Sequence, residues 1–283
     1  MSDYASAIKK RTSVRTFNKR GLDSSQIDEI NRTISSLGKG PMGSGIRVEL
    51  VNRNQVLATR KAKLGTYGFI NGAEYFLCGC TVKKKRAEID YGYVFEKLIL
   101  DLTSINIGTC WLGGTFNRSQ WGSLVDLKQD EFIPAISPVG IPSNSKAIRE
   151  RLIRRAAKAN SRKPWSELFM MDQFGTPIGK KDAAEFEPVL EMVRLAPSAS
   201  NKQPWRLLKV REKYHLILCR TPGYGIKSVD LQMLDMGIAM FHFESVAGEN
   251  KLPGSWKVDT EKPLLPKECE YIATWDRSSS PST

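Results

Sequence analysis

Two long helical patterns constrain this chain most, because both are apolar over most of their circumference. The stretch "DYGYVFEKLILDLTSINIGTCW" begins at Asp90, and "VDLQMLDMGIAMFHFESVAG" contains a second helix that begins at Asp230. A helix that is apolar on nearly every side needs other elements to cover it. Each half of the 283-residue chain is small, so we expect the two halves to fold against each other through these helices.

An internal repeat accompanies the two helices. Their starting aspartates are 140 positions apart, and so are Tyr75 and His215, which open the preceding strand-like segments. The earlier strand patterns, at Ile46 and Trp205, are 159 positions apart, so the second copy is shorter by about 19 residues. This spacing indicates a degenerate duplication of one half-unit.

The alternating patterns predict an α+β fold, with a mixed or antiparallel central sheet surrounded by helices and internally duplicated. We expect a first half over 1–170 and a second half over 171–275, joined as one integrated unit, and a disordered tail over 276–283. The helix in the "DSSQIDEINRTISSLG" stretch should begin at Asp23 or Ser24. Other helices are expected at 4–11 and 182–197, and strands at 45–51, 73–82, 132–142, 205–211 and 214–220.

The formal net charge of +13 permits three interpretations of the basic segment 145–163. It is a solvated helix face, a nucleic-acid contact, or a source of positive potential that attracts small anions such as phosphorylated cofactors. No recognised nucleic-acid module accompanies the charge, so we expect no nucleic-acid partner.

The cysteines and the hydropathy pattern indicate the cellular compartment in which the protein is expected. The five cysteines are scattered, and no Cys-x-x-Cys pair is present, so we expect reduced thiols in a cytoplasmic protein, without a disulfide framework or a zinc site. The N-terminus lacks the apolar core of a secretory signal, and no run of about 18 apolar residues predicts a membrane span. The cysteines are Cys78, Cys80, Cys110, Cys219 and Cys269.

Two segments of the first half could bind a ligand. Arg11, Ser13 and Arg15 can converge on one phosphate, although a solvated basic turn has the same pattern. Gly113 and Gly114 would let a backbone approach a flat ligand closely, although they equally fit a turn at the entry to a strand.

Two further segments carry polar groups. Arg162, in "NSRKPW", could add a phosphate contact. The loop "RLAPSASNKQPWRLL" presents Ser198, Ser200 and Asn201 between two stiffening prolines, and Trp205 can anchor it in the core. These features predict a rigid polar rim around a pocket.

Five segments together resemble the FMN-dependent nitroreductase family, over roughly residues 4–250. They are "RTSVRTF", "NIGTCWLGG", "PAISPVGIP", "SRKPW" and "APSASNKQPW". The resemblance is strongest to the branch in which two half-sites are fused in one chain. It implies a nitroreductase-like fold and an oxidoreductase that takes hydride from NAD(P)H. The hydride would pass through flavin N5 to a nitroaromatic, quinone or similar acceptor in a ping-pong cycle.

The resemblance also implies roles for individual residues, although it assigns no catalytic acid. Asn160 stands where family members often have lysine, which removes one positive charge. A positive charge at Arg15 would favour the reduced flavin. The phosphate and pyrimidine side would be held by Arg11, Ser13, Arg15 and Arg162, the ring and ribityl chain by Ser198, Ser200 and Asn201, and flavin N5 would face the backbone of Gly113 and Gly114.

Each half retains what the other lacks. The first half has "SSLGKGPMGSG" in place of the Pro-Ser-Asn loop, and the second half lacks the Arg-x-Ser-x-Arg motif. We therefore expect one FMN site per chain, in a monomer that acts as an intrachain pseudo-dimer on a small-molecule acceptor. The alternatives are a non-catalytic flavin-binding or sensor protein and, ranked below it, a basic nucleic-acid-binding protein.

Overall fold

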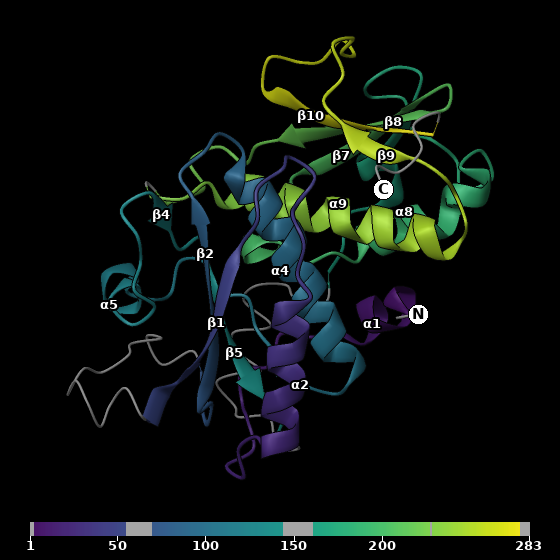
Figure 1. The fold of residues 1–283 in the computed structure, drawn as a ribbon. Coiled ribbons are helices and arrows are strands. Elements are labelled where there is room, and N and C mark those ends of the chain that lie inside the picture. The colour runs from purple at the N-terminus through teal and green to yellow at the C-terminus, as the bar shows by residue number, and fades with distance from the viewer. Residues whose placement is uncertain (1–2, 55–69, 144–160, 227, 278–283) are drawn as a thin grey trace.

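The computed structural model describes residues 3–54, 70–143, 161–226 and 228–277. Two five-stranded sheets lie on either side of two crossing helices, α4 (Ala87–Ser104) and α9 (Leu231–Glu249) (Figure 1). The basic segment 145–163 falls almost wholly outside the described residues, so its role stays a prediction.

The first sheet is antiparallel throughout. Its strand order is β1–β2–β5–β3, and β4 pairs with the end of β2. The central strand β2 is buried along most of its length because it has neighbours on both edges. The bounds are β1 (Arg47–Asn52), β2 (Tyr75–Val82), β3 (Gly108–Thr109), β4 (Glu131–Phe132) and β5 (Ile136–Gly140).

The second sheet is mixed, in the order β6–β7–β8–β10–β9, and only its β6–β7 pair is parallel. The predicted α+β class with mixed and antiparallel sheets is therefore confirmed. Asp276, assigned to the predicted tail, instead ends β10 and lies buried 2.5 Å from Lys257. The bounds are β6 (Phe169–Met171), β7 (Trp205–Val210), β8 (Lys213–Cys219), β9 (Ser255–Lys257) and β10 (Cys269–Asp276).

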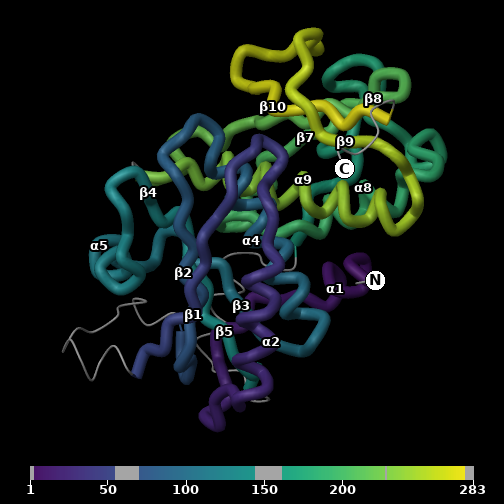
Figure 2. The backbone as a smooth tube through the Cα atoms, viewed as in Figure 1, coloured from purple at the N-terminus to yellow at the C-terminus, as the bar shows by residue number. Residues whose placement is uncertain are grey.

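The remaining helical elements are short, and those at Tyr4–Lys10, Ser24–Ser35 and Glu187–Arg194 pack on the two long helices. Asp23 caps α2, exchanging hydrogen bonds with Gln26, which confirms the predicted start. Tyr4 of α1 packs against Phe241 of α9 at 5.2 Å, so the start of the chain lies on the second half (Figure 2). None of the helices described is long and apolar enough to cross a membrane. These elements are α1 (Tyr4–Lys10), α2 (Ser24–Ser35), α5 (Arg118–Gly122), α7 (Trp165–Leu168), α8 (Glu187–Arg194) and the 3₁₀ turns η1 (Ala184–Phe186) and η2 (Ala199–Asn201).

The two long helices meet backbone to backbone at two glycines. A Cβ atom added at Gly92 would lie 2.1 Å from the carbonyl oxygen of Leu234 on α9. One added at Gly237 would lie 1.9 Å from the carbonyl oxygen of Ile89 on α4. Only glycine permits this approach, so the packing of the two helices depends on both positions.

The crossing corrects the proposed alignment of the repeat. Asp230 is the N-cap of α9, whereas α4 begins at Ala87, so Asp90 does not open its helix. In its place relative to the crossing glycine, Asp235 rather than Asp230 resembles Asp90: each lies two residues before that glycine, and the two are 145 positions apart.

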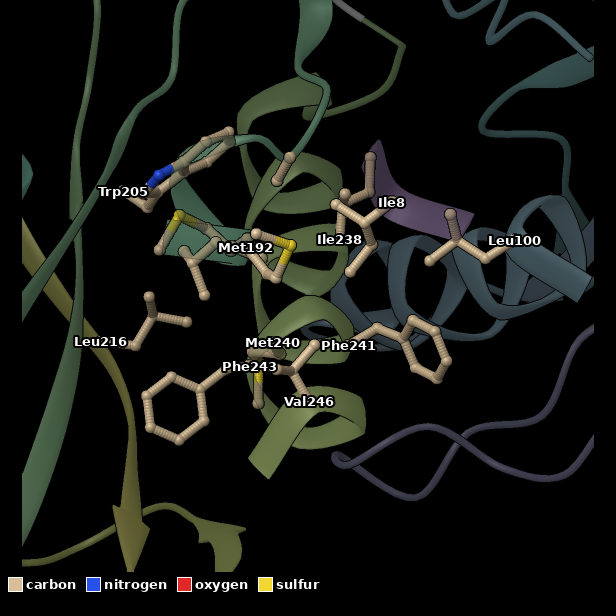
Figure 3. Close-up of a cluster of buried hydrophobic side chains, with 14 of the residues drawn as sticks. Ile8, Leu100, Met192, Trp205, Leu216, Ile238, Met240, Phe241, Phe243 and Val246 are labelled. Carbon is tan, nitrogen blue, oxygen red and sulfur yellow. The ribbon is translucent and has the colours of Figure 1, made fainter. Parts of the chain in front are cut away.

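One apolar cluster connects the two sheets through the long helices. In Figure 3, Phe243 lies on the β8 side of α9 with Leu216, whereas Ile238 and Phe241 lie on the side of α4. Both sides of α9 are therefore buried, which explains why its sequence is apolar all round.

A disulfide links two strands of the second sheet. Cys219 of β8 and Cys269 of β10 stand directly opposite each other, with Cα atoms 4.4 Å apart. The expectation of reduced thiols was wrong for this pair, whereas Cys78, Cys80 and Cys110 are buried thiols outside any disulfide. Spacing could not reveal the pair, because its members are 50 residues apart and meet only when β10 pairs with β8.

We expect the Cys219→Ser/Cys269→Ser variant to lose about 2–4 kcal/mol of unfolding free energy. The disulfide closes a loop of 50 residues, and opening that loop gives the unfolded chain more conformational freedom. Urea unfolding followed by circular dichroism measures the loss. Dithiothreitol should destabilise the parent by a similar amount and leave the variant unchanged, and a parent insensitive to it would contradict the prediction.

Candidate functional site

The segment from Arg11 to Arg15 leaves α1 and runs beside β3. Ser13 pairs with Thr109, and the Val14 N–H donates to the Thr109 carbonyl at 2.8 Å. Arg11, Ser13 and Arg15 are half-buried, and Arg15 Nη1 donates to the Ser13 carbonyl at 3.5 Å. The predicted phosphate-binding residues therefore lie along the strand that leads to the paired glycines.

The paired glycines lie against the start of α9. A Cβ atom at Gly113 would be 2.7 Å from Leu231 Cδ2, so a side chain there would displace Leu231. Gly114 is exposed, and a Cβ atom there would lie 4.0 Å from Ile226. Arg118 holds the segment by donating to the Gly113 carbonyl. Neither glycine has a left-handed φ, so backbone conformation does not require glycine at either position.

The loop 197–204 is fixed by its own polar groups. Ser198 Oγ accepts from the Gln203 N–H at 2.9 Å, and the Asn201 N–H donates to the Ser198 carbonyl at 2.9 Å. Ser200, Asn201 and Gln203 have φ values of 47°, 55° and 49°. Each left-handed non-glycine residue costs about 1–3 kcal/mol, and such strain clusters at functional sites. The loop is thus held in one unusual conformation.

Arg162 lies against this loop. Its Nη1 atom donates to Asn201 Oδ1 at 3.5 Å, and Asn201 Nδ2 donates to the Ser161 carbonyl at 2.9 Å. Gln203, which the sequence reasoning missed, is buried and accepts from the Lys163 N–H at 2.8 Å. The sequence signal for Gln203 was its position directly before the Pro-Trp pair that ends the loop. The predicted Arg162 and Asn201 are therefore in direct contact.

Positive charge is concentrated around Arg162. Burial lowers the pKa of Arg162, and the charges of Arg11 and Arg194 lower it further. Arg194 is paired with Glu191 at 2.9 Å, so its charge is partly balanced. Like charges that lie near one another in a half-buried region repel each other and create a positive potential, which attracts an anion. Arg11 and Arg162, far apart in sequence, are therefore close enough in the fold to influence each other electrostatically.

A second loop, 221–230, borders the site and was not anticipated. The Tyr224 hydroxyl donates to Ser200 Oγ at 2.9 Å, and Gln232 of α9 donates to the Tyr224 carbonyl at 3.2 Å. Lys202 lies over the Tyr224 ring at 5.4 Å. A tyrosine inside the turn-forming sequence "PGYG" was the only sequence signal.

Two cavities are lined by residues other than those predicted to bind the cofactor. One of about 350 Å³ is lined partly by the loop before α9, including Tyr224 and Ile226. A larger one, about 1030 Å³, is lined by Leu208 and His215. These two side chains alternate with core residues of β7 and β8, so the larger cavity opens on the face of the sheet away from α9 and apart from this site. No group of side chains in the described ranges could hold a metal ion.

Comparisons with known proteins agree on one family. The family model described as "Putative TM nitroreductase" matches residues 3–247. A "putative nitroreductase" structure from Thermotoga maritima aligns with a TM-score of 0.60 at 19% identity, covering 96% of this chain and 91% of that chain. An FMN-dependent nitroreductase from Clostridium difficile aligns at a TM-score of 0.39 and 12% identity, covering 50% and 88% of the two chains. None of the curated proteins matches. The predicted nitroreductase-like fold is confirmed, and the chain belongs to the nitroreductase family that this model describes.

Proposed function

We propose that this protein is an FMN-dependent NAD(P)H oxidoreductase of the nitroreductase type. Its acceptor would be a nitroaromatic, a quinone or a similar small molecule. The proposal rests on family membership and on one observation: Arg162 contacts Asn201 of the strained loop and lies within the electrostatic influence of Arg11. This contact supports a single site that includes Arg162 and the loop.

The residues at this place fit FMN. The positive region around Arg11 and Arg162, with Ser13 on the same segment, suits the phosphate. The polar side chains of Ser198, Ser200 and Asn201 suit the ring and the ribityl chain. Gly113 and Gly114 carry no side chains, so their backbone could approach a flat ring closely. When bound, FMN supplies the hydride chemistry.

The protein's own groups would position the ligand and set its charge environment. Arg15, the last residue of the phosphate-binding segment, is the proposed positive charge that favours the reduced state of the cofactor. No side chain is assigned as a general acid, and solvent could supply the proton.

We further propose one FMN site per chain, in a monomer built as an intrachain pseudo-dimer of halves 1–170 and 171–275. The support is the repeated arrangement of a sheet, a long helix and a crossing glycine, with phosphate-binding residues in only one half. The disulfide between Cys219 and Cys269 does not support a cytoplasmic location, because disulfides are rare in the reducing cytoplasm.

Absorption spectroscopy tests the function directly. The purified protein should be yellow, contain one FMN per chain and lose its flavin absorbance when NAD(P)H is added. A colourless protein that takes up no FMN would contradict the proposal. Bound FMN without turnover would favour the non-catalytic flavin-binding alternative, and two FMN per chain would contradict the single site.

We expect Arg11→Gln and Arg162→Gln each to weaken FMN binding about 10- to 100-fold, because each removes a charged hydrogen bond to phosphate. Riboflavin, which lacks the phosphate, should bind these variants and the parent alike. Fluorescence titration with both ligands makes the comparison. Arg32→Gln is the control, since Arg32 lies exposed on α2 and its guanidinium is paired with Glu29 at 2.5 Å. Equal losses for both ligands would reject the phosphate role.

A further inference from the structure

A buried carboxylate on α9 holds the strained loop. Asp235 Oδ1 accepts from the Ala199 N–H at 2.9 Å. Asp235 is 1% exposed, and no hydrogen-bond partner of its Oδ2 atom is found in the part of the chain that the structure describes. Burial raises the pKa of Asp235, and the charge of Asp230 adds to this, against the opposing effect of the Ala199 hydrogen bond. A carboxyl oxygen accepts this bond whether or not the group is ionised.

Ala199 lies at the centre of the proposed flavin contacts. Ser198 and Ser200 are its neighbours, and the left-handed residues follow immediately at 200, 201 and 203. Without the bond to Asp235, the loop would lose its anchor to α9 and could relax from this conformation. The bond therefore fixes where Ser198 and Ser200 present their hydroxyl groups.

The first half has a matching contact. Asp90 on α4 accepts from the N–H groups of Met42 and Ser44 at 2.6 and 2.7 Å. Asp90 and Asp235 each lie two residues before a crossing glycine, and each holds the loop that precedes the first long strand of its half, β1 or β7. The loop held by Asp90, "GKGPMGSG", has no counterpart of the Pro-Ser-Asn sequence.

We propose that Asp235 is a positioning residue for the flavin site, and that Asp90 makes the same kind of contact in a loop that binds no flavin. This inference rests on the proposed function. It identifies a carboxylate that does not itself contact the cofactor and that governs affinity through the Ala199 N–H. The two aspartates form a matched pair, because their local roles in folding are alike and only one holds flavin-binding residues.

The test compares Asp235→Ala, Asp235→Asn and Asp90→Ala in the full-length protein. We measure the thermal midpoint, the dissociation constants of FMN and riboflavin, and the visible circular dichroism of the bound flavin. Asp235→Ala should weaken both ligands about tenfold or more and change the flavin spectrum, since one buried bond and the loop conformation are lost. Asp90→Ala should lower the thermal midpoint but leave both affinities within about threefold. Asp235→Asn keeps an acceptor and should resemble the parent.

A second variant reaches the same bond from the loop. Ala199→Pro removes the donor N–H, and Ser198, at φ −148° and ψ 160°, already has the extended backbone that precedes proline. It should reproduce the loss in affinity even if Asp235→Ala does not fold. If Asp235→Ala or Ala199→Pro bound FMN and riboflavin as tightly as Asp90→Ala does, the inference would be overturned and the proposed function would stand. A parent that binds no FMN would overturn the proposed function and the inference together.

Discussion

Replacing Gly237 with alanine should remove at least about 3 kcal/mol of unfolding free energy, at the upper end of the usual cost of overpacking. The new Cβ atom would lie 1.9 Å from the Ile89 carbonyl oxygen and 2.7 Å from the Tyr93 nitrogen. Both are backbone atoms of a helix, so no side-chain rotation can relieve the overlap. The two long helices would have to separate, and the core between the sheets would open. Urea unfolding monitored by tryptophan fluorescence measures the change.

Gly248 provides a control on the same helix. A Cβ atom added there would meet nothing within 4 Å, so Gly248→Ala should stabilise the protein by about 0.5–1 kcal/mol through helix propensity. Gly92→Ala should behave like Gly237→Ala, since its Cβ atom would lie 2.1 Å from the Leu234 carbonyl oxygen. If Gly237→Ala and Gly248→Ala unfolded at the same urea concentration, the backbone crossing described here would be incorrect.

Replacing Glu96 with leucine should destabilise the protein by about 3–5 kcal/mol, because it removes one partner of a buried ionisable pair. Glu96 and His242 are both 0% exposed, and Glu96 Oε1 lies 3.0 Å from His242 Nε2. His242 Nδ1 donates to the Met192 carbonyl at 2.9 Å, and Trp111 Nε1 donates to Glu96 Oε2 at 2.7 Å. The variant would leave His242 Nε2 and Trp111 Nε1 without their buried hydrogen-bond partner.

Two comparisons separate this effect from a general loss of charge. Lys97→Met on the same helix breaks a half-exposed pair with Asp101 and should cost no more than about 1 kcal/mol. The double variant Glu96→Leu/His242→Leu should cost less than the sum of the two single changes, since the residues are coupled. Additive losses in urea unfolding would show that the pair does not act as a unit.

The sequence correctly predicted the features that depend on local patterns, namely helix burial, a helix cap and a rigid loop. The all-round apolar pattern of α9 correctly predicted a helix covered on both sides, and the capping residues at Asp23 predicted the start of α2. The rigid polar loop was predicted from its prolines and Trp205, and Trp205 is fully buried. These properties depend on neighbours within a few residues, so they can be read directly from the chain.

The sequence pattern could not predict contacts between segments that are far apart in the chain. The offset of 140 residues pairs Asp230, which is an N-cap, with Asp90, which lies inside α4, because the pattern alone does not show where each helix begins. Asp235, buried in α9, was missed because its partner is a backbone N–H 36 residues away. The disulfide and Tyr224 were missed for the same reason, since neither partner carries a local signal.

By itself, the sequence determined an α+β chain with two long buried helices, because hydropathy pattern, capping and turn chemistry are local. Only the tertiary structure decided that Arg162 contacts Asn201, that Gly92 and Gly237 let the helices touch, and that an aspartate holds each loop. Those relations depend on the helix crossing and the strand pairing, which bring together atoms that the chain order separates.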